Sequence, residues 1–435
     1  MNGFESGQHG RRTRLRVPAW VPIAGAVVLV AGVLIFVFGT GGGNTNTSAP
    51  ADHHASSPRS TLPPALALAA TNPASGAQGV ATNTQISVTF SEPVSLRGGA
   101  TPTLAPQVAG TWVQSSPTTL TYQLQSPLVP SSHEVVTIPG GSAGLHARDG
   151  ASLPSSATLS FDVAPGDTLR LQQLLAGLEY LPVGFTPSGP PPAPADLAVD
   201  QQGAFGWRWP SLPAELTSQW TQGASNEITR AAVEDFESQN GLGVDGIAGP
   251  AVWTALLNDT VSNKPSGTPY VFVLVNKALP ENLTLWSNGA PQLAGIPVNT
   301  GLPGADTTDG SYAVFEHVRF SEMKGTNPDG SHYDDPNVPY ASYFNGGDAL
   351  HGFVRASYGS PQSNGCVEMT YANAAQVWPL TPIGTLVTVV GPNYGSAPPP
   401  PPPTTTPTTT TPTTAPPPPT TTTTVPAPPP ATPAP

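Results

Sequence analysis

The chain has 435 residues, of which 56 are proline, 45 are glycine and one is cysteine. This length exceeds that of an ordinary single domain, so we expect several folded units. The 27 acidic and 15 basic residues give a net charge of -12. Because contacts to phosphates need clustered Lys and Arg, this balance argues against a nucleic-acid partner. The composition therefore predicts a multidomain protein that binds no nucleic acid.

The N-terminus predicts a membrane anchor. Residues 1–16 are basic, and residues 17–40 contain no charged side chain. As a helix rising about 1.5 Å per residue, the apolar segment is long enough to cross a hydrocarbon core of about 30 Å. The arginines keep residues 1–16 in the cytoplasm, which places everything after residue 40 outside. The alternative is a cleaved signal peptide, since the small-residue sequence TSAPA follows.

Two segments are predicted to carry no fold of their own. Residues 41–70 are polar and Pro-rich, as expected of a linker that holds the folded part away from the membrane. Residues 396–435 form a Pro/Thr-rich tail, which favours extended polyproline II, cannot bury a core and is predicted to be disordered.

Residues 71–164 predict an antiparallel β-sandwich. The runs TQISVTF, TLTYQL, HEVVTI and ATLSFDV alternate apolar and polar side chains and are separated by Pro, Gly, Ser and Asn. The opening sequence NPASGAQGVATNTQISVTFSEPVS resembles bacterial Ig-like domains of cell-surface proteins. That resemblance implies a spacer or docking module, and the segment contains no catalytic constellation of its own.

Residues 165–260 predict a helical domain. Leucines in DTLRLQQLLAGLEYL recur at helical spacing after a capping Asp167, a second helix in NEITRAAVEDFESQNGL ends at Gly241, and Pro250 begins a third. The three segments resemble the peptidoglycan-binding domain type 1 family, a three-helix module, with a long insertion over residues 182–225. For the tryptophans of this insertion, stacking on a saccharide and packing in a core are both open; they are Trp207, Trp209 and Trp220.

Residues 268–391 predict a mostly-β domain that contains the only thiol. The segments YVFVLVNKALPENLTLWSNGAPQLAGIPVNTGL, SYAVFEHVRF and IGTLVTVVG are typical of strands and turns. Cys366 follows His351 in the chain and lies directly after Asn364-Gly365, a turn-forming pair. A thiol is a weak nucleophile until a base takes its proton, and His351 is the natural base. The turn would present backbone N–H groups to an oxyanion.

Two other interpretations of the thiol are open at this point. An inert buried cysteine beside an unrelated histidine has the same spacing. A zinc site of Cys366, His332 and His351 lacks the CxxC or HxxxH spacing of common zinc sites, so we predict no metal and no cofactor.

The sequences ALHGF and SYGSPQSNGCVEM, with VNTGL and TTDGSYAVF upstream and VWPLTPIGTLVTV downstream, resemble the catalytic domain of L,D-transpeptidases of the YkuD type. The signature of that family is His-Gly followed by Ser/Thr-His-Gly-Cys. The matching residues are His351, Gly352, Ser363, Gly365 and Cys366. The resemblance implies Cys366 as the nucleophile and His351 as the general base.

The chain departs from the family pattern twice. Asn364 stands where the family has histidine, and Glu368 stands where many members have arginine. Because asparagine also donates a side-chain hydrogen bond, we expect activity to survive with an altered substrate preference. Ser363, Asn364, Gly365 and Gly352 are the expected oxyanion or substrate-binding residues, and Tyr340 and Phe344 are the expected walls of the cleft.

The resemblance implies a reaction with peptidoglycan. Cys366 would attack the meso-diaminopimelate carbonyl of a tetrapeptide stem and expel D-Ala, and an amine of a second stem would resolve the thioester into a three-to-three cross-link. Two alternatives remain: an L,D-carboxypeptidase with water as the acceptor, and a non-catalytic wall-binding protein with a vestigial site. The expected partners are donor and acceptor stems and the cytoplasmic membrane, with the catalytic part outside, facing the wall of a bacterial cell.

Overall fold

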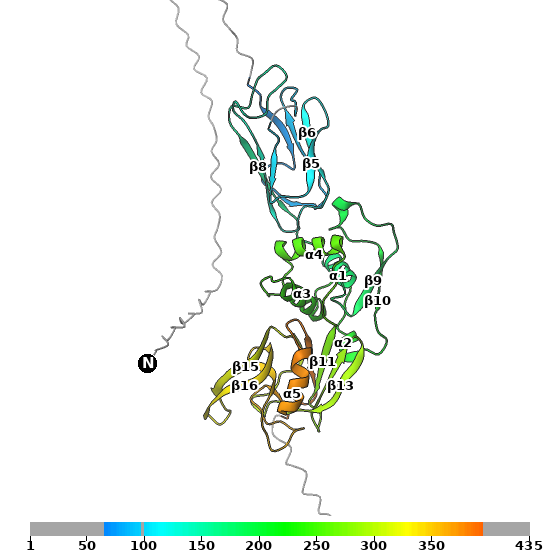
Figure 1. The fold of residues 1–435 in the computed structure, drawn as a ribbon, viewed down its shortest axis with the longest axis vertical. Coiled ribbons are helices and arrows are strands. Elements are labelled where there is room, and N and C mark those ends of the chain that lie inside the picture. Colours follow the sequence, from blue (N-terminus) through cyan, green and yellow to red (C-terminus); the bar gives the residue numbers. More distant parts are fainter. Residues whose placement is uncertain (1–64, 97–99, 395–435) are drawn as a thin grey trace, which may run out of the picture. The chain divides into compact units, whose positions relative to one another are not determined.

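The structure is a computed structural model that describes residues 65–96 and 100–394. The predicted basic N-terminus, the transmembrane helix, the linker up to residue 64 and the tail lie outside the described residues. Within the described part of the chain, no helix is both long and apolar enough to cross a membrane. The described residues form the multidomain, mostly-β architecture that the sequence predicts (Figure 1).

The first domain is a β-sandwich of two four-stranded sheets. One sheet has the strand order β1-β3-β6-β5 and the other β2-β8-β7-β4. The buried positions alternate along the strands, as in β3, where Ile86, Val88 and Phe90 face the core. This confirms the predicted sandwich. The strands are β1 (Leu68–Asn72), β2 (Ala77–Val80), β3 (Ile86–Phe90), β4 (Thr103–Ala105), β5 (Gly110–Gln114), β6 (Thr119–Leu124), β7 (His133–Ile138) and β8 (Ala157–Val163).

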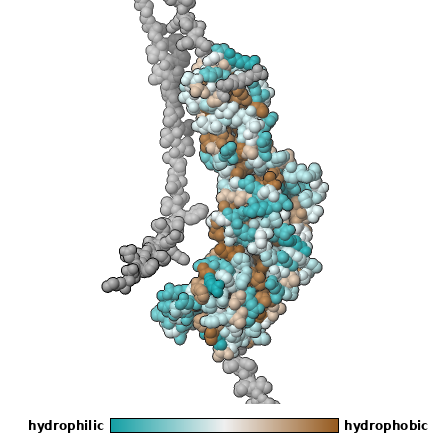
Figure 2. Space-filling model, viewed as in Figure 1, coloured by the Kyte–Doolittle hydropathy of each residue, from teal (hydrophilic) through white to brown (hydrophobic). Residues whose placement is uncertain are grey.

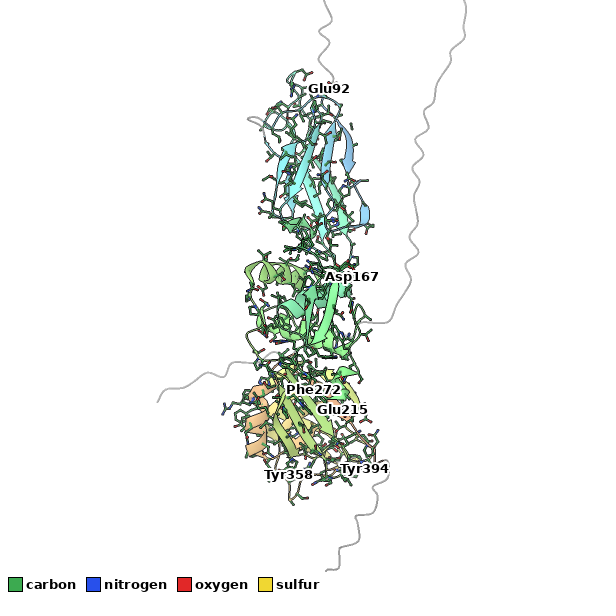
Figure 3. All side chains as sticks on the ribbon, turned by 90° about the vertical axis from the view of Figure 1, so that its right-hand side faces the viewer. Glu92, Asp167, Glu215, Phe272, Tyr358 and Tyr394 are labelled. Carbon is green, nitrogen blue, oxygen red and sulfur yellow. The ribbon has the colours of Figure 1, made fainter. Side chains whose placement is uncertain are left out.

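The second domain contains three long helices. Asp167 (labelled in Figure 3) caps the first by accepting a hydrogen bond from the Leu169 N–H, and Pro250 occupies the first turn of the last. After α3 the chain turns at Gly241, whose φ of 66° suits glycine. The helices are α1 (Thr168–Gly177), α2 (Ala214–Thr217), α3 (Glu227–Gln239) and α4 (Pro250–Ser262).

The insertion of the helical domain is itself folded. It contributes a two-stranded antiparallel sheet of β9 (Val183–Pro187) and β10 (Gly203–Trp207), with the short helix η1 (Pro194–Asp196) between them. Two of its tryptophans pack on aromatic side chains: Trp220 lies against Phe205, and Trp209 stacks on Tyr270. Packing therefore accounts for these two tryptophans, whereas Trp207 is partly exposed.

The third domain is built on two sheets that enclose one apolar core. The five-stranded sheet has the order β13-β12-β11-β19-β14, and the four-stranded sheet has the order β15-β16-β17-β18. Val271, Val273 and Val275 of β11 face this core, whereas Phe272 of the same strand (labelled in Figure 3) is fully buried in the apolar cluster of the helical domain. The elements are β11 (Val271–Asn276), β12 (Asn282–Ser287), β13 (Ala290–Pro297), β14 (Gly310–Ala313), β15 (Glu316–Thr326), β16 (His332–Asn345), β17 (Asp348–Gly352), β18 (Val367–Met369), α5 (Tyr371–Val377), η2 (Trp378–Leu380) and β19 (Leu386–Val390).

The four-stranded sheet contains strands that the sequence patterns did not predict. The segment ALHG lies in β17, which pairs antiparallel with β16 and parallel with β18. The parallel pairing sets Leu350 opposite Val367 and His351 opposite Glu368, so Cys366, the residue just before β18, lies level with Ala349, two residues before the histidine on β17. This arrangement positions the candidate site.

Candidate active site

Cys366 and His351 line one cavity of about 490 Å³. One side of the cavity consists of β17, β18, the residues just before each strand, and Phe353 and Arg355 after β17. The other side is the β15–β16 hairpin, which contributes both charged and aromatic side chains. The cavity residues are Glu322, Met323, Lys324, Asn327, Tyr333, Asp335, Tyr343, Gly347, Asp348, His351, Phe353, Arg355, Asn364, Cys366 and Glu368. The structure thus brings the predicted nucleophile and the predicted base to the same cavity.

His351 is held in one tautomer. The residue is 2% exposed, and its Nδ1 lies 3.1 Å from the backbone carbonyl oxygen of Gly352. Because a carbonyl only accepts hydrogen bonds, Nδ1 carries the proton and the neutral ring keeps a free lone pair on Nε2. Burial lowers the pKa of His351 below its usual value. The imidazole is therefore neutral at neutral pH and able to accept a proton.

Cys366 is protonated in the resting site. Burial raises the pKa of its thiol to about 12, and the negative charges of Asp348 and Glu368 raise it as well. A hydrogen bond from the backbone N–H of Ala349 acts in the opposite direction but does not offset burial. The thiol itself lies 3.6 Å from the Gly347 carbonyl oxygen. With a neutral thiol and a neutral imidazole in the same cavity, the thiol proton must pass to the imidazole before or during the attack.

The turn before Cys366 is fixed by several hydrogen bonds. Ser363 Oγ donates to the Cys366 carbonyl oxygen at 2.6 Å and accepts from the Gly365 N–H at 3.2 Å, while Thr307 Oγ1 donates to the Gly365 carbonyl oxygen at 2.7 Å. Gly365 has a φ of 115°, and a Cβ there would lie 2.2 Å from Asp348 Oδ1. Only glycine fits this position. The N–H of Gly365, an expected oxyanion donor, is already bonded to Ser363.

The other predicted small residue, Gly352, also supports the site. A Cβ on Gly352 would lie 2.8 Å from the ring of Tyr371, the first residue of α5. The glycine therefore allows α5 to pack directly on β17, and its carbonyl oxygen orients His351. Gly352 thus packs against α5 and does not line the cavity.

Asn364, which replaces the motif histidine, lines the cavity and reaches the hairpin. Its side-chain amide donates a 2.5 Å hydrogen bond to Asn327 Oδ1, in the turn between β15 and β16. The position thus joins the turn before the thiol to the opposite wall of the cavity.

The expected cleft walls Tyr340 and Phe344 do not line the cavity. Phe344 is 2% exposed and belongs to the apolar core, and Tyr340 packs against that core and against Trp378. Since side chains alternate along a strand, Tyr343 takes the cavity side, together with Tyr333 of the same strand. Sequence reasoning chose the right segment of the chain and missed the residues that face the cavity.

Arg355 and Glu368 form an ion pair on the cavity wall that sequence reasoning missed. Arg355 Nε and Nη2 each donate a 2.7 Å hydrogen bond to one carboxylate oxygen of Glu368. Arg355 follows β17, in the segment that also contains Tyr358 (labelled in Figure 3). The acidic residue at position 368, unusual for the family pattern, was the one signal that a basic partner was needed nearby.

The structure gives no support to the zinc alternative. His332 lies beside the turn of the hairpin, where its Nδ1 is 3.1 Å from Thr326 Oγ1, and it does not line the cavity. In residues 65–96 and 100–394, no three His, Cys, Asp or Glu side chains are grouped as metal ligands.

Three family models match the chain. The bacterial Ig-like domain matches residues 62–163, the peptidoglycan binding domain matches residues 216–256, and the L,D-transpeptidase catalytic domain matches residues 270–389. The last match contains every residue of the cavity described above. No curated protein sequence matches the chain.

Solved structures of similar proteins include L,D-transpeptidases. One from Mycobacterium smegmatis is 13% identical and covers 75% of this chain and 100% of its own, with a TM-score of 0.25. L,D-transpeptidase 3 from Mycobacterium tuberculosis, bound to a faropenem-derived adduct, is 14% identical over 74% of this chain and 97% of its own, with a TM-score of 0.26. The catalytic domain from E. faecium is 23% identical over 28% of this chain and 96% of its own, with a TM-score of 0.25.

Proposed function

Residues 270–389 form an L,D-transpeptidase catalytic domain, which makes this chain a cysteine-dependent peptidoglycan transpeptidase, and on that premise we propose that Cys366 and His351 carry its reaction. The observation that supports this assignment most strongly is that a nucleophile and a proton acceptor line the same cavity. The only thiol of the chain and an imidazole with a free Nε2 lone pair line the same space.

In the first half-reaction, the thiol of Cys366 attacks the carbonyl carbon of the L-centre of meso-diaminopimelate in a donor tetrapeptide. The S–H proton passes to Nε2 of His351 as the S–C bond forms. The resulting imidazolium gives that proton to the nitrogen of the terminal D-Ala as the C–N bond breaks. D-Ala leaves as a free amino acid, and the stem remains as a thioester on Cys366.

In the second half-reaction, an amine of a neighbouring stem attacks the thioester. His351 takes the proton of the attacking amine, the C–S bond breaks, and the thiolate recovers a proton from the imidazolium. The product is a three-to-three cross-link. Throughout, the hydrogen bond from Nδ1 to the Gly352 carbonyl oxygen holds the ring and stabilises the imidazolium that forms in each half.

The other parts of the chain support action at the cell wall. A peptidoglycan binding domain adjoins the catalytic domain in sequence, and tethering to a polymer raises the effective concentration of its stems. We include in the proposal that residues 17–40, outside the described residues, anchor the chain in the cytoplasmic membrane. Extraction of the protein from membranes by detergent but not by high salt would support this anchor, and release by salt alone would contradict it.

The reaction is tested by incubating the full-length protein with a disaccharide-tetrapeptide that contains meso-diaminopimelate, with Cys366→Ala alongside. Mass spectrometry should show dimers that lack one D-Ala, formed only by the unaltered protein. Free tripeptide without dimer would assign the carboxypeptidase instead. If the protein forms no thioester and releases no D-Ala, the remaining interpretation is a wall-binding protein with a vestigial site.

A further inference from the structure

The ion pair of Arg355 and Glu368 lies beside the catalytic imidazole. Glu368 is 4% exposed, and in the parallel β17–β18 pairing it stands opposite His351. The guanidinium of Arg355 lies 4.7 Å from the ring centroid of Phe353, and the ring of Phe353 meets the imidazole of His351 edge to face at 5.9 Å. The guanidinium is thus held rigidly on the cavity wall by a bidentate carboxylate and an aromatic ring.

Part of this guanidinium is free to bind a ligand. Nε and Nη2 are used by Glu368, whereas Nη1 makes no hydrogen bond to any residue in the described part of the chain. The side chain is 31% exposed and lines the cavity. Its two Nη1 hydrogens are therefore donors without a protein acceptor, and a carboxylate is the group that such donors bind best.

The rest of the cavity disfavours a carboxylate. Three acidic side chains besides Glu368 line it: Glu322, Asp335 and Asp348. The other cation, Lys324, is tied on the protein surface to two carboxylates, Glu322 at 2.9 Å and Asp334 at 3.2 Å. A negatively charged group of a substrate is repelled by most of this lining, which leaves Arg355 as its one favourable position beside the thiol.

We propose that Arg355 is a specificity-determining residue that receives a free carboxylate of the donor stem through Nη1, with Glu368 fixing its orientation. The proposal rests on the proposed function, since it names how that substrate is selected. A donor tetrapeptide offers two such carboxylates near the reacting carbonyl, the terminal one of D-Ala and the side-chain one of meso-diaminopimelate. Selection at either position would discriminate a carboxylate from its carboxamide, which has the same shape and no charge.

Four donors separate the two sources. One has both carboxylates free, one has D-Ala as a carboxamide, one has the diaminopimelate side chain as a carboxamide, and one has both as carboxamides. For the full-length protein, we expect kcat/KM for thioester formation to fall about 10- to 100-fold when the carboxylate bound by Arg355 is replaced, and to change little for the other.

The decisive variants are E368Q and the double variant R355Q/E368Q. The double variant removes the guanidinium without leaving a buried unpaired carboxylate, which would destabilise the fold. We expect E368Q to keep the preference for the carboxylate and R355Q/E368Q to lose it, with a ratio near 1. Arg319→Lys is the matched control, because Arg319 does not line the cavity and packs near Phe320 and Tyr340. Thermal denaturation verifies that each variant is folded.

A carboxylate preference that persists in folded R355Q/E368Q would overturn the proposal, as would equal rates of Cys366 acylation by all four donors. Failure of the proposed function is distinct, because then no donor forms a thioester. In that case, calorimetric titration of Cys366→Ala with the same four donors measures their dissociation constants, and so tests whether Arg355 selects a carboxylate without any reaction. If Cys366→Ala binds a carboxylate donor more tightly than its carboxamide, and the preference is lost when the same protein also carries R355Q/E368Q, the proposal is supported. Equal binding of carboxylate and carboxamide donors overturns the proposal.

Discussion

The two walls of the proposed catalytic cavity differ in how firmly the fold holds them. On one wall, four of the five residues of β17 and all of β18 are buried, and β17 is paired on both of its edges. On the other wall, the distal halves of β15 and β16 pair only with each other, and their side chains alternate between exposed and half-buried. Figure 2 shows hydrophilic side chains gathered over this hairpin. We call the first the buried wall and the second the hairpin wall.

This difference indicates a division of roles. Reacting groups need a fixed geometry, and a central strand with paired edges and buried side chains opens only at high free-energy cost. Contacts to a substrate tolerate more variation, and an exposed hairpin accommodates substitutions without disturbing the core. The proposed catalytic pair, Cys366 and His351, lies on the buried wall, whereas polar side chains such as Asn327, Tyr333 and Asp335 come from the hairpin wall.

The largest effect is expected when histidines of the two walls are compared. We expect His351→Ala to slow thioester formation by about 10²- to 10⁴-fold, because the thiol loses its proton acceptor. His332→Ala, on the hairpin wall, should leave the rate within about twofold of the original, since His332 lies outside the cavity. Acylation followed by mass spectrometry measures both. An equal loss of the rate of thioester formation in the two variants would contradict the assignment of His351 as the base.

The next effect is expected at two glycines with positive φ. Gly365→Ala places a Cβ against Asp348 and strains a φ of 115°, so we expect acylation to fall by about tenfold or more. Gly330→Ala, in the hairpin turn at a φ of 85°, meets no atom within 4 Å. It should lower the thermal midpoint slightly and leave acylation unchanged. Retained activity in Gly365→Ala would show that the turn before the thiol is more adaptable than its contacts indicate.

A smaller effect is expected in the pH dependence of Tm, which should differ between an aspartate of the buried wall and one of the hairpin wall. On the buried wall, burial raises the pKa of Asp348 to about 6. The pKa of Asp348 in the folded protein exceeds its unfolded value of 3.8. The contribution of Asp348 to the free energy of unfolding is therefore most favourable below pH 4 and is lost as the pH rises through about 6. Asp348→Asn removes this loss, and we expect Tm to rise by about 2–4 °C at pH 8 and to change little at pH 4.

Asp329 in the hairpin turn should behave in the opposite way. Hydrogen bonds from Ser331 lower the pKa of Asp329. A lowered folded pKa contributes stability above the unfolded pKa and loses it as the pH falls through the folded value. Asp329→Asn should therefore lower Tm slightly at neutral pH, and the difference from the unaltered protein should disappear in acid. The same sign for both variants in thermal scans would contradict the comparison.

The smallest effect concerns the contact that joins the walls. Asn364→Ala and Asn327→Ala each remove the hydrogen bond between the two asparagines, and each should reduce kcat/KM about two- to fivefold. The double variant should be no slower than either single one, because the same interaction is lost. Steady-state kinetics measures all three. Additive losses would indicate that the two side chains act separately on the substrate.

Local patterns predicted most of the fold. The runs of the sandwich coincide with strands because one face of each is buried, and period-2 alternation records that burial directly. Asp167 and Pro250 begin helices where the cap chemistry places them. The patterns failed for β17 and β18, since DALHG and VEM are too short and too buried to alternate.

Within the site, the pattern of the sequence led to the thiol and the histidine but not to the residues around them. Tyr340 and Phe344 were expected on the cavity wall because they precede His351 in the chain. The register of β16 shifts twice, between Ser321 and Met323 of its partner β15 and between Tyr343 and Asn345. A shift of one residue exchanges the two faces of a strand, so the facing aromatic residue cannot be chosen from the sequence.

The sequence by itself determined the classes of the domains, the single thiol and the His-Gly and Gly-Cys motifs, because these depend on residue type and on spacing along the chain. The tertiary structure alone decided which groups meet. Arg355 and Glu368 lie 13 residues apart and become partners only through the parallel pairing of β17 with β18. Likewise, the raised pKa of the Cys366 thiol follows from burial, and burial is a property of the folded chain as a whole.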